Sequence, residues 1–206
     1  MSNRYWFSVG ALALVAAVAG VYVARMVTQP AVPSLESGTS YPAPRALPDF
    51  NLVDAHGTAT TPATLAGHPT LVFFGFTHCP DVCPTTLALL ASVQKRASLP
   101  NLKVAFITVD PERDTPAQVG AYVASFGGDF IGLTGTAPEI LKATGGFGVA
   151  AARVELAGGD YTMDHSAAVF ALDSQARIVA VFTPPLSADR LARDVQRLAP
   201  VLNLHP

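Results

Sequence analysis

Residues 73–84 read "FFGFTHCPDVCP" and contain both cysteines of the 206-residue chain, Cys79 and Cys83. An apolar run at residues 70–77 precedes the pair, and a segment with apolar residues at helical spacing follows it. This pattern predicts a buried strand followed by a helix, with both cysteines in the turn between them. Four interpretations are open for the pair: a disulfide clip, a redox pair, a peroxide-reducing site and half of a metal site.

The spacing of the two cysteines gives them a shared chemistry. Residues at i and i+4 lie on one side of a helix, so both sulfur atoms face the same way in the first turn. The positive end of the helix dipole favours a thiolate over a thiol. Lowering a cysteine pKa from about 8.5 to about 7 takes about 2 kcal/mol, which a helix N-terminus and partial burial can supply. We therefore expect ionised sulfurs that are nucleophilic and bind soft metals.

Three specific interpretations fit the sequence poorly. A disulfide clip would close a very short loop and remove little entropy from the unfolded chain. A peroxiredoxin-like site would place a threonine three residues before the reactive cysteine, whereas Thr77 lies two residues before Cys79. A structural zinc site needs four ligands, usually with a second cysteine pair, and this chain has no further cysteine.

His165 is the candidate for a third metal ligand. It lies in "YTMDHSAAVF", directly before a predicted central strand, and Asp164 beside it could orient the ring. The alternative is an ordinary loop histidine bonded to backbone. The other histidines lie in turns, in the tail, or beside Cys79 but pointing away from it: His56, His68, His78 and His205.

Residues 49–206 alternate between strand-like and helix-like segments, which is typical of an α/β domain with a mixed central sheet flanked by helices. The turn at residues 173–176 predicts an antiparallel hairpin. Asp114 or Thr115 is the expected cap of one helix, and Ser187 of the last. The expected strands are 70–77, 103–110, 167–173 and 177–183, with shorter ones near 50–53 and 154–161, and the expected helices are 84–98, 114–127 and 187–198.

The N-terminal part has a different composition. Tyr5 to Ala24 are twenty uncharged positions between Arg4 and Arg25, about the length of a membrane-spanning helix. We predict an anchor at residues 1–27, a proline-rich linker at 28–48 and the folded domain at 49–206. Small residues at 17–19 leave a cleaved signal peptide as the alternative. The flanking charges favour an N-terminus in the cytoplasm and an exported domain. The segment lacks the character of a mitochondrial transit peptide, which points to a single-pass protein of a bacterial inner membrane, with its soluble domain facing the periplasm or the cell exterior.

The net charge excludes one class of partner. The chain carries a formal charge of -2 at pH 7, and its 13 Lys and Arg residues form no cluster. Phosphate backbones are bound by concentrated positive charge, so we expect no nucleic-acid partner.

Three motifs, in this order, resemble the Sco/SenC family. They are "FGFTHCPDVCPTTL" (residues 74–87), "VDPERDTP" (109–116) and "DHS" (164–166). The resemblance implies a thioredoxin-like fold and copper binding through Cys79, Cys83 and His165, as Cu(I), Cu(II) or both. It also implies a metallochaperone, not an enzyme, that serves the binuclear copper centre of cytochrome c oxidase.

The resemblance leaves the partners and a second activity as expectations. The implied acceptor is the copper-binding subunit of the oxidase, and another exported copper chaperone is a candidate donor. The alternative function is a thiol-disulfide oxidoreductase in which Cys79 and Cys83 keep cysteines of an exported protein reduced. A copper or redox sensor is a third option, although no sequence feature marks a signalling surface. Asp110 could lie near the site because it ends a strand, whereas Asp81 is expected to be a helix-start residue.

Overall fold

The computed structural model describes residues 13–14, 16–21, 33–99 and 101–202. The chain divides into two compact units, residues 1–31 and 32–206. In the first unit, residues 13–14 and 16–21 are helical. No helix formed by described residues has the length and apolar character needed to span a bilayer. The predicted anchor falls mostly on residues outside this description, so it stays a prediction.

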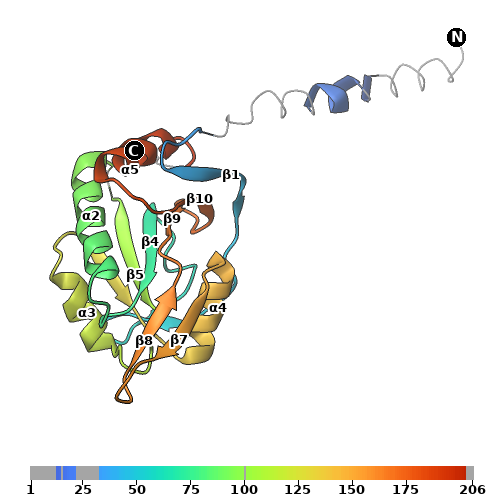
Figure 1. The fold of residues 1–206 in the computed structure, drawn as a ribbon. Helices are drawn as coiled ribbons and strands as arrows, with labels where there is room; N and C mark the ends of the chain where they lie inside the picture. Colours follow the sequence, from blue (N-terminus) through green and yellow to red (C-terminus); the bar gives the residue numbers. More distant parts are fainter. Residues whose placement is uncertain (1–12, 15, 22–32, 100, 203–206) are drawn as a thin grey trace, which may run out of the picture. The chain divides into compact units, whose positions relative to one another are not determined.

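A six-stranded mixed sheet forms the centre of the second unit (Figure 1). Its strands are Gly38–Arg45 (β1), Thr70–Gly75 (β4), Lys103–Thr108 (β5), Phe130–Leu133 (β6), Val169–Leu172 (β9) and Ile178–Phe182 (β10). Their spatial order is β1-β10-β9-β4-β5-β6. β4, β5 and β6 run parallel, whereas β9, β10 and β1 continue the sheet by antiparallel pairing. The predicted mixed sheet is therefore confirmed.

Two strand pairs lie outside this sheet. Leu52–Val53 (β2) pairs with Ala59–Thr60 (β3). Ala151–Glu155 (β7) pairs with Tyr161–His165 (β8), with Gly158 and Gly159 in the turn between them. This second hairpin carries His165 at its end, so its placement decides where that side chain lies.

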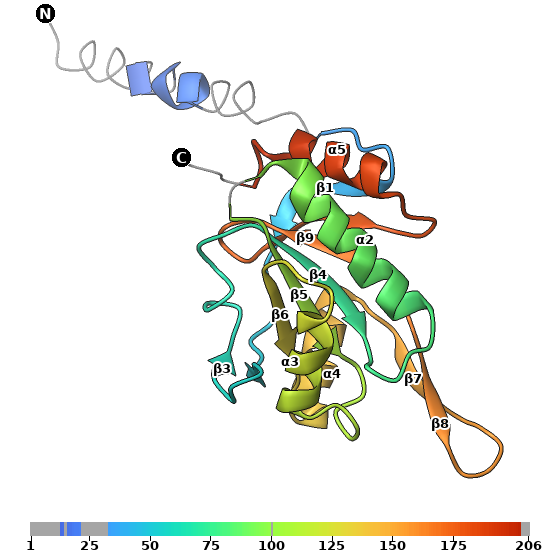
Figure 2. The same cartoon turned by 90° about the vertical axis from the view of Figure 1, so that its left-hand side faces the viewer.

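Four helices cover the two faces of the sheet (Figures 1 and 2). They are Val82–Ala97 (α2), Pro116–Ala124 (α3), Ala137–Phe147 (α4) and Ala188–Leu198 (α5). α2 and α3 lie on one face, with α5 packed against α2, and α4 lies on the other. Thr115, not Asp114, caps α3, and its side chain forms a capping box with Gln118.

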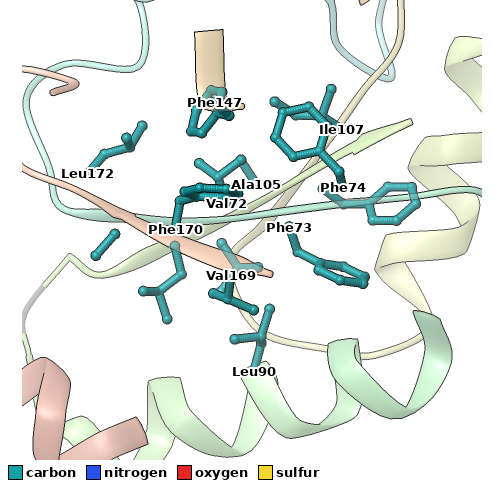
Figure 3. Close-up of a cluster of buried hydrophobic side chains, with 14 of the residues drawn as sticks. Val72, Phe73, Phe74, Leu90, Ala105, Ile107, Phe147, Val169, Phe170 and Leu172 are labelled. Carbon is teal, nitrogen blue, oxygen red and sulfur yellow. The ribbon is translucent and has the colours of Figure 1, made fainter. Parts of the chain in front are cut away.

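The core follows from the two-residue period of β4, whose six residues are all buried. Phe73 lies opposite Val169 of β9, on the side of Leu90 in α2 (Figure 3). Phe74 faces the other way, and its ring centroid lies 5.1 Å from that of Phe147 in α4. A strand that is apolar on both faces can therefore hold a helix layer on each side.

The expected linker at residues 28–48 is wrong for its second half. Residues 38–45 form β1, which pairs with β10 at the sheet edge. The fully buried carboxylate of Asp194 accepts hydrogen bonds from the backbone amides of Glu36 and Ser37, at 2.8 Å each. The strand contains two prolines, which usually argue against a strand. They are tolerated here because β1 lies at the edge of the sheet. The folded domain therefore begins before Asp49.

One helix had no counterpart among the sequence predictions. α4 begins after Thr136 with a proline in its first turn and ends at Gly148, which has a φ of 72°. Both are ordinary helix signals. Gly145 and Gly146 within the helix weaken its periodicity, and Gly146 lies where a Cβ would approach Pro48 to 2.2 Å. Tertiary packing, more than helix propensity, forms this element.

Candidate metal site

The cysteine turn joins the end of β4 to the start of α2, as predicted. Cys83 lies in the first turn of α2 and is fully buried, whereas Cys79 is half-buried and precedes the helix, so the expected shared helical turn is wrong. The backbone amide of Cys83 donates to the Cys79 Sγ at 3.4 Å. Both cysteines are free thiols. The two sulfurs are therefore neighbours, and one of them already accepts a hydrogen bond from the helix start.

Gly75 provides the room for the buried sulfur. A Cβ at this position would lie 2.8 Å from the Cys83 Sγ and 2.7 Å from the Phe106 ring. Real Cβ atoms do not approach other atoms so closely, so a larger residue would push the sulfur or the ring aside. The glycine of the quoted motif is thus a packing requirement of the site.

His165 reaches the cysteine turn from β8. Its Nε2 lies 3.6 Å from the Cys83 Sγ, and its Nδ1 lies 3.2 Å from the backbone oxygen of Ser166. A carbonyl oxygen can only accept, so Nδ1 carries the proton and the lone pair of Nε2 faces the sulfur. This tautomer is the one in which Nε2 can bind a metal.

The group that orients the His165 ring differs from the one expected. Asp164 is exposed, and the His165 Nδ1 is bonded to the Ser166 carbonyl oxygen instead. Successive residues of a strand point to opposite faces, which turns the Asp164 side chain away from the ring. Asp164 acts on His165 only as a nearby charge.

Aromatic residues surround the imidazole. The ring centroids of Phe73 and Phe76 lie 6.2 and 5.9 Å from that of His165, both in edge-on geometry. Burial lowers the pKa of His165, against the opposing effects of the Ser166 carbonyl and Asp164. The ring is therefore neutral at pH 7, the form that ligates metals.

Burial raises the pKa of the Cys83 thiol, which reverses the expectation of a thiolate at this position. A hydrogen bond from the Phe76 backbone opposes this shift, and Cys79 and Asp114 add to it. The helix dipole cannot outweigh the loss of water around a fully buried sulfur. Without metal, Cys83 is a protonated thiol, which is within reach of the lone pair of the His165 Nε2.

Asp114 is the functional residue that the sequence analysis missed. Its fully buried carboxylate accepts from the Thr77 amide at 2.9 Å, the Thr77 hydroxyl at 2.6 Å and the Thr108 hydroxyl at 2.5 Å. It thereby fixes the start of the cysteine turn to the end of β5. The available signal was the "VDPERDTP" motif, whose aspartates were interpreted as a strand end and a helix cap.

Asp110, from the same motif, is bonded to the hairpin that carries His165. Its carboxylate accepts from the Tyr161 hydroxyl at 2.9 Å and from the Arg113 Nε at 2.6 Å. Asp81 is exposed just before α2, as expected for a helix-start residue, and its side chain does not cap the helix.

The three predicted ligands are brought together, but as a loose set. Within residues 33–99 and 101–202, no three His, Cys, Asp or Glu side chains are close enough to enclose a metal ion. The ligands would therefore have to draw closer on binding. Two sulfurs and one imidazole are a soft donor set that suits Cu(I), and the imidazole also suits Cu(II).

Known proteins are similar to this chain in sequence and in fold. The pattern that defines the SCO1/SenC family matches residues 39–200. A Danio rerio protein named "Protein SCO2 homolog, mitochondrial" is 37% identical over 153 residues, which cover 72% of this chain and 55% of that protein. The chain thus spans little more than half the length of this relative.

Two similar solved structures contain copper. The Bradyrhizobium japonicum ScoI structure with copper bound is 41% identical and has a TM-score of 0.67, and the match covers 74% of this chain and 99% of that chain. The Arabidopsis thaliana ScoI structure with copper bound is 34% identical, has a TM-score of 0.70, and covers 73% and 95%. This similarity confirms the expected thioredoxin-like α/β fold. By its motifs, its fold and the extent of the match, this chain belongs to the SCO1/SenC family.

Proposed function

We propose that this chain is a copper metallochaperone that carries copper on Cys79, Cys83 and His165 and delivers it for cytochrome c oxidase assembly. The observation that carries the proposal is the 3.6 Å approach of the His165 Nε2 to the Cys83 Sγ, beside the second cysteine. Cys83 and His165 are 82 positions apart in sequence. The fold brings the imidazole to the sulfur in the tautomer that can bind a metal.

Copper suits this donor set better than zinc does. Three ligands leave zinc one short of its usual tetrahedral set, whereas Cu(I) is stable with two or three soft ligands. Relatives of 34% and 41% identity bind copper in their solved structures. A site of few ligands, of which Cys79 and His165 are half-buried, can also pass its metal to a partner by exchanging one ligand at a time.

The position in the cell and the partners are part of the same proposal. Residues 5–24 would anchor the chain in a bacterial inner membrane, with the second unit in the periplasm. The acceptor would be the copper-binding subunit of the oxidase, and an exported copper chaperone would be the donor. Fractionation of cells that express the full chain tests the anchor, because removal of residues 1–27 should release the protein from the membrane.

The carrier role is better supported than the reductase role. A dithiol reductase attacks with a thiolate, and its rate depends on the ionised fraction of that cysteine. Cys83 is fully buried, and its burial raises its pKa. A metal that displaces the proton would use this sulfur without needing it ionised beforehand.

Titration of the reduced full chain in detergent, with Cu(I) and separately with Cu(II), tests the function. We expect one copper ion per chain, strong loss of Cu(I) binding in Cys79→Ser and Cys83→Ser, and loss of Cu(II) binding in His165→Ala. His56→Ala, which changes an exposed histidine, is the matched control. Tight one-to-one binding in all three ligand variants would place the site elsewhere.

A further inference from the structure

The hairpin that carries His165 is weakly supported by its own structure. β7 and β8 form a two-stranded sheet separate from the central one, and every residue of β7 is exposed. An isolated two-stranded hairpin is marginally stable in water. Bonds to the rest of the domain must therefore determine whether His165 stays beside Cys83.

Tyr161, the first residue of β8, makes several such bonds. Its ring lies between two guanidinium groups, with the Cζ atoms of Arg113 and Arg153 each 3.7 Å from its centroid. Its hydroxyl donates to the Asp110 carboxylate at 2.9 Å, and its backbone oxygen accepts from Arg113 Nη1 at 3.0 Å. Cation–π contacts of this kind contribute about 0.5–2 kcal/mol each, depending on exposure.

Two of the partners of Tyr161, Asp110 and Arg113, lie outside the hairpin, whereas Arg153 belongs to β7. Asp110 follows β5 and is only 2% exposed, and its amide donates to the Thr108 hydroxyl at 2.9 Å. Its carboxylate also pairs with Arg113. Arg113 is 6.0 Å from the Phe76 ring, which contacts His165. The turn at residues 110–113 thus links the central sheet to both ends of the strand that carries His165.

We propose that Tyr161 is a positioning residue for His165, and that the turn at residues 110–113 holds it in place. Tyr161 and His165 are four residues apart in β8, so their side chains lie on the same face of that strand. Fixing the first residue of β8 fixes the direction in which the last one leaves it. The inference deepens the proposed function, since it assigns the control of the third copper ligand to this clamp.

The clamp is tested with Tyr161→Ala and Tyr161→Phe in the full chain. The alanine variant removes the ring between the two guanidinium groups, whereas the phenylalanine variant keeps the ring and removes only the bond to Asp110. Leu156→Ala is the matched control, because Leu156 directly follows β7 in the same hairpin and is 48% exposed. All three changes lie outside the buried core, so the domain should fold.

Two readouts are expected to change. In the metal-free protein, hydrogen exchange of the β8 amides should accelerate in Tyr161→Ala, less in Tyr161→Phe, and stay unchanged in Leu156→Ala. Cu(II) affinity should fall about 10–100-fold in Tyr161→Ala, the usual cost of removing a group that supports a metal ligand. Unchanged exchange and unchanged Cu(II) affinity in Tyr161→Ala would overturn the clamp.

A double-mutant comparison separates positioning from general damage. If Tyr161 acts through His165, Tyr161→Ala should leave the residual Cu(I) affinity of His165→Ala unchanged. An equal loss in both backgrounds would contradict the proposal. The hydrogen-exchange readout needs no metal, so it tests the clamp even if copper proves to bind elsewhere, which would overturn only the proposed function.

Discussion

The two halves of the candidate copper site are supported in opposite ways. Cys83 is fully buried at the start of α2, against the all-buried strand β4. His165 stands at the end of a hairpin whose other strand, β7, consists of exposed residues. The cysteine side is therefore as rigid as the core, whereas the histidine side depends on a few side-chain bonds. A carrier benefits from this difference, because one ligand can leave while the other two hold the metal.

Two buried aspartates of one turn divide the support between these halves. Asp114 binds the start of the cysteine turn, and Asp110 binds the hairpin through Tyr161. They are four residues apart, and the Asp114 amide donates to the Asp110 backbone oxygen at 3.0 Å. A single motif thus connects the rigid sulfur side of the site with the less supported imidazole side.

The largest expected effect is a loss of folding stability when the core next to the cysteines is disrupted. Phe73→Ala removes a fully buried ring and should lower the free energy of unfolding by about 3–5 kcal/mol. Val154→Ala, at an exposed position of β7, should change it by no more than about 0.5 kcal/mol. Chemical denaturation of both variants measures the contrast, and similar losses would show that the hairpin belongs to the core after all.

The next effect distinguishes the two aspartates. Asp114→Asn should lower the free energy of unfolding by about 2–3 kcal/mol, because three donors around a buried carboxylate lose a charged acceptor. Asp110→Asn should cost less in global stability but accelerate hydrogen exchange in β8. Denaturation and exchange measurements on the pair check this division. Equal exchange in β8 for both variants would contradict it.

The smallest effect is a pH dependence of the copper affinity, which follows from the different protonation states of the Cys83 thiol and the His165 ring. Burial raises the pKa of Cys83 and lowers that of His165, so at pH 7 the thiol holds a proton and the ring does not. Copper binding must therefore release at least the Cys83 proton. The apparent affinity should rise about tenfold per pH unit, or about 1.4 kcal/mol, as the pH increases through neutrality. Proton release, measured while copper is added in weakly buffered solution, checks the sign of this pH dependence. A copper affinity that does not change with pH would contradict the prediction.

Much of the fold could be predicted because its central elements carry strong local signals. β4 and β5 are continuous apolar runs, and α3 has both a capping threonine and an early proline. β1 could not be predicted in this way, because its proline-containing sequence becomes a strand only where β10 offers an edge and Asp194 holds the chain before it. α4 was not predicted for a similar reason, because its glycines have low helix propensity and the helix forms through tertiary packing.

The sequence by itself determined that both sulfurs lie where a buried strand gives way to a helix, since this follows from residue spacing and apolar runs. It also singled out His165, through its place before a central strand and through a family resemblance. Only the tertiary structure decided that the His165 Nε2 lies against Cys83, that burial keeps this thiol protonated, and that Asp110 and Asp114 support opposite halves of the site. Protonation and long-range contacts depend on which groups the folded chain removes from water and brings together, and no local pattern of residues encodes that.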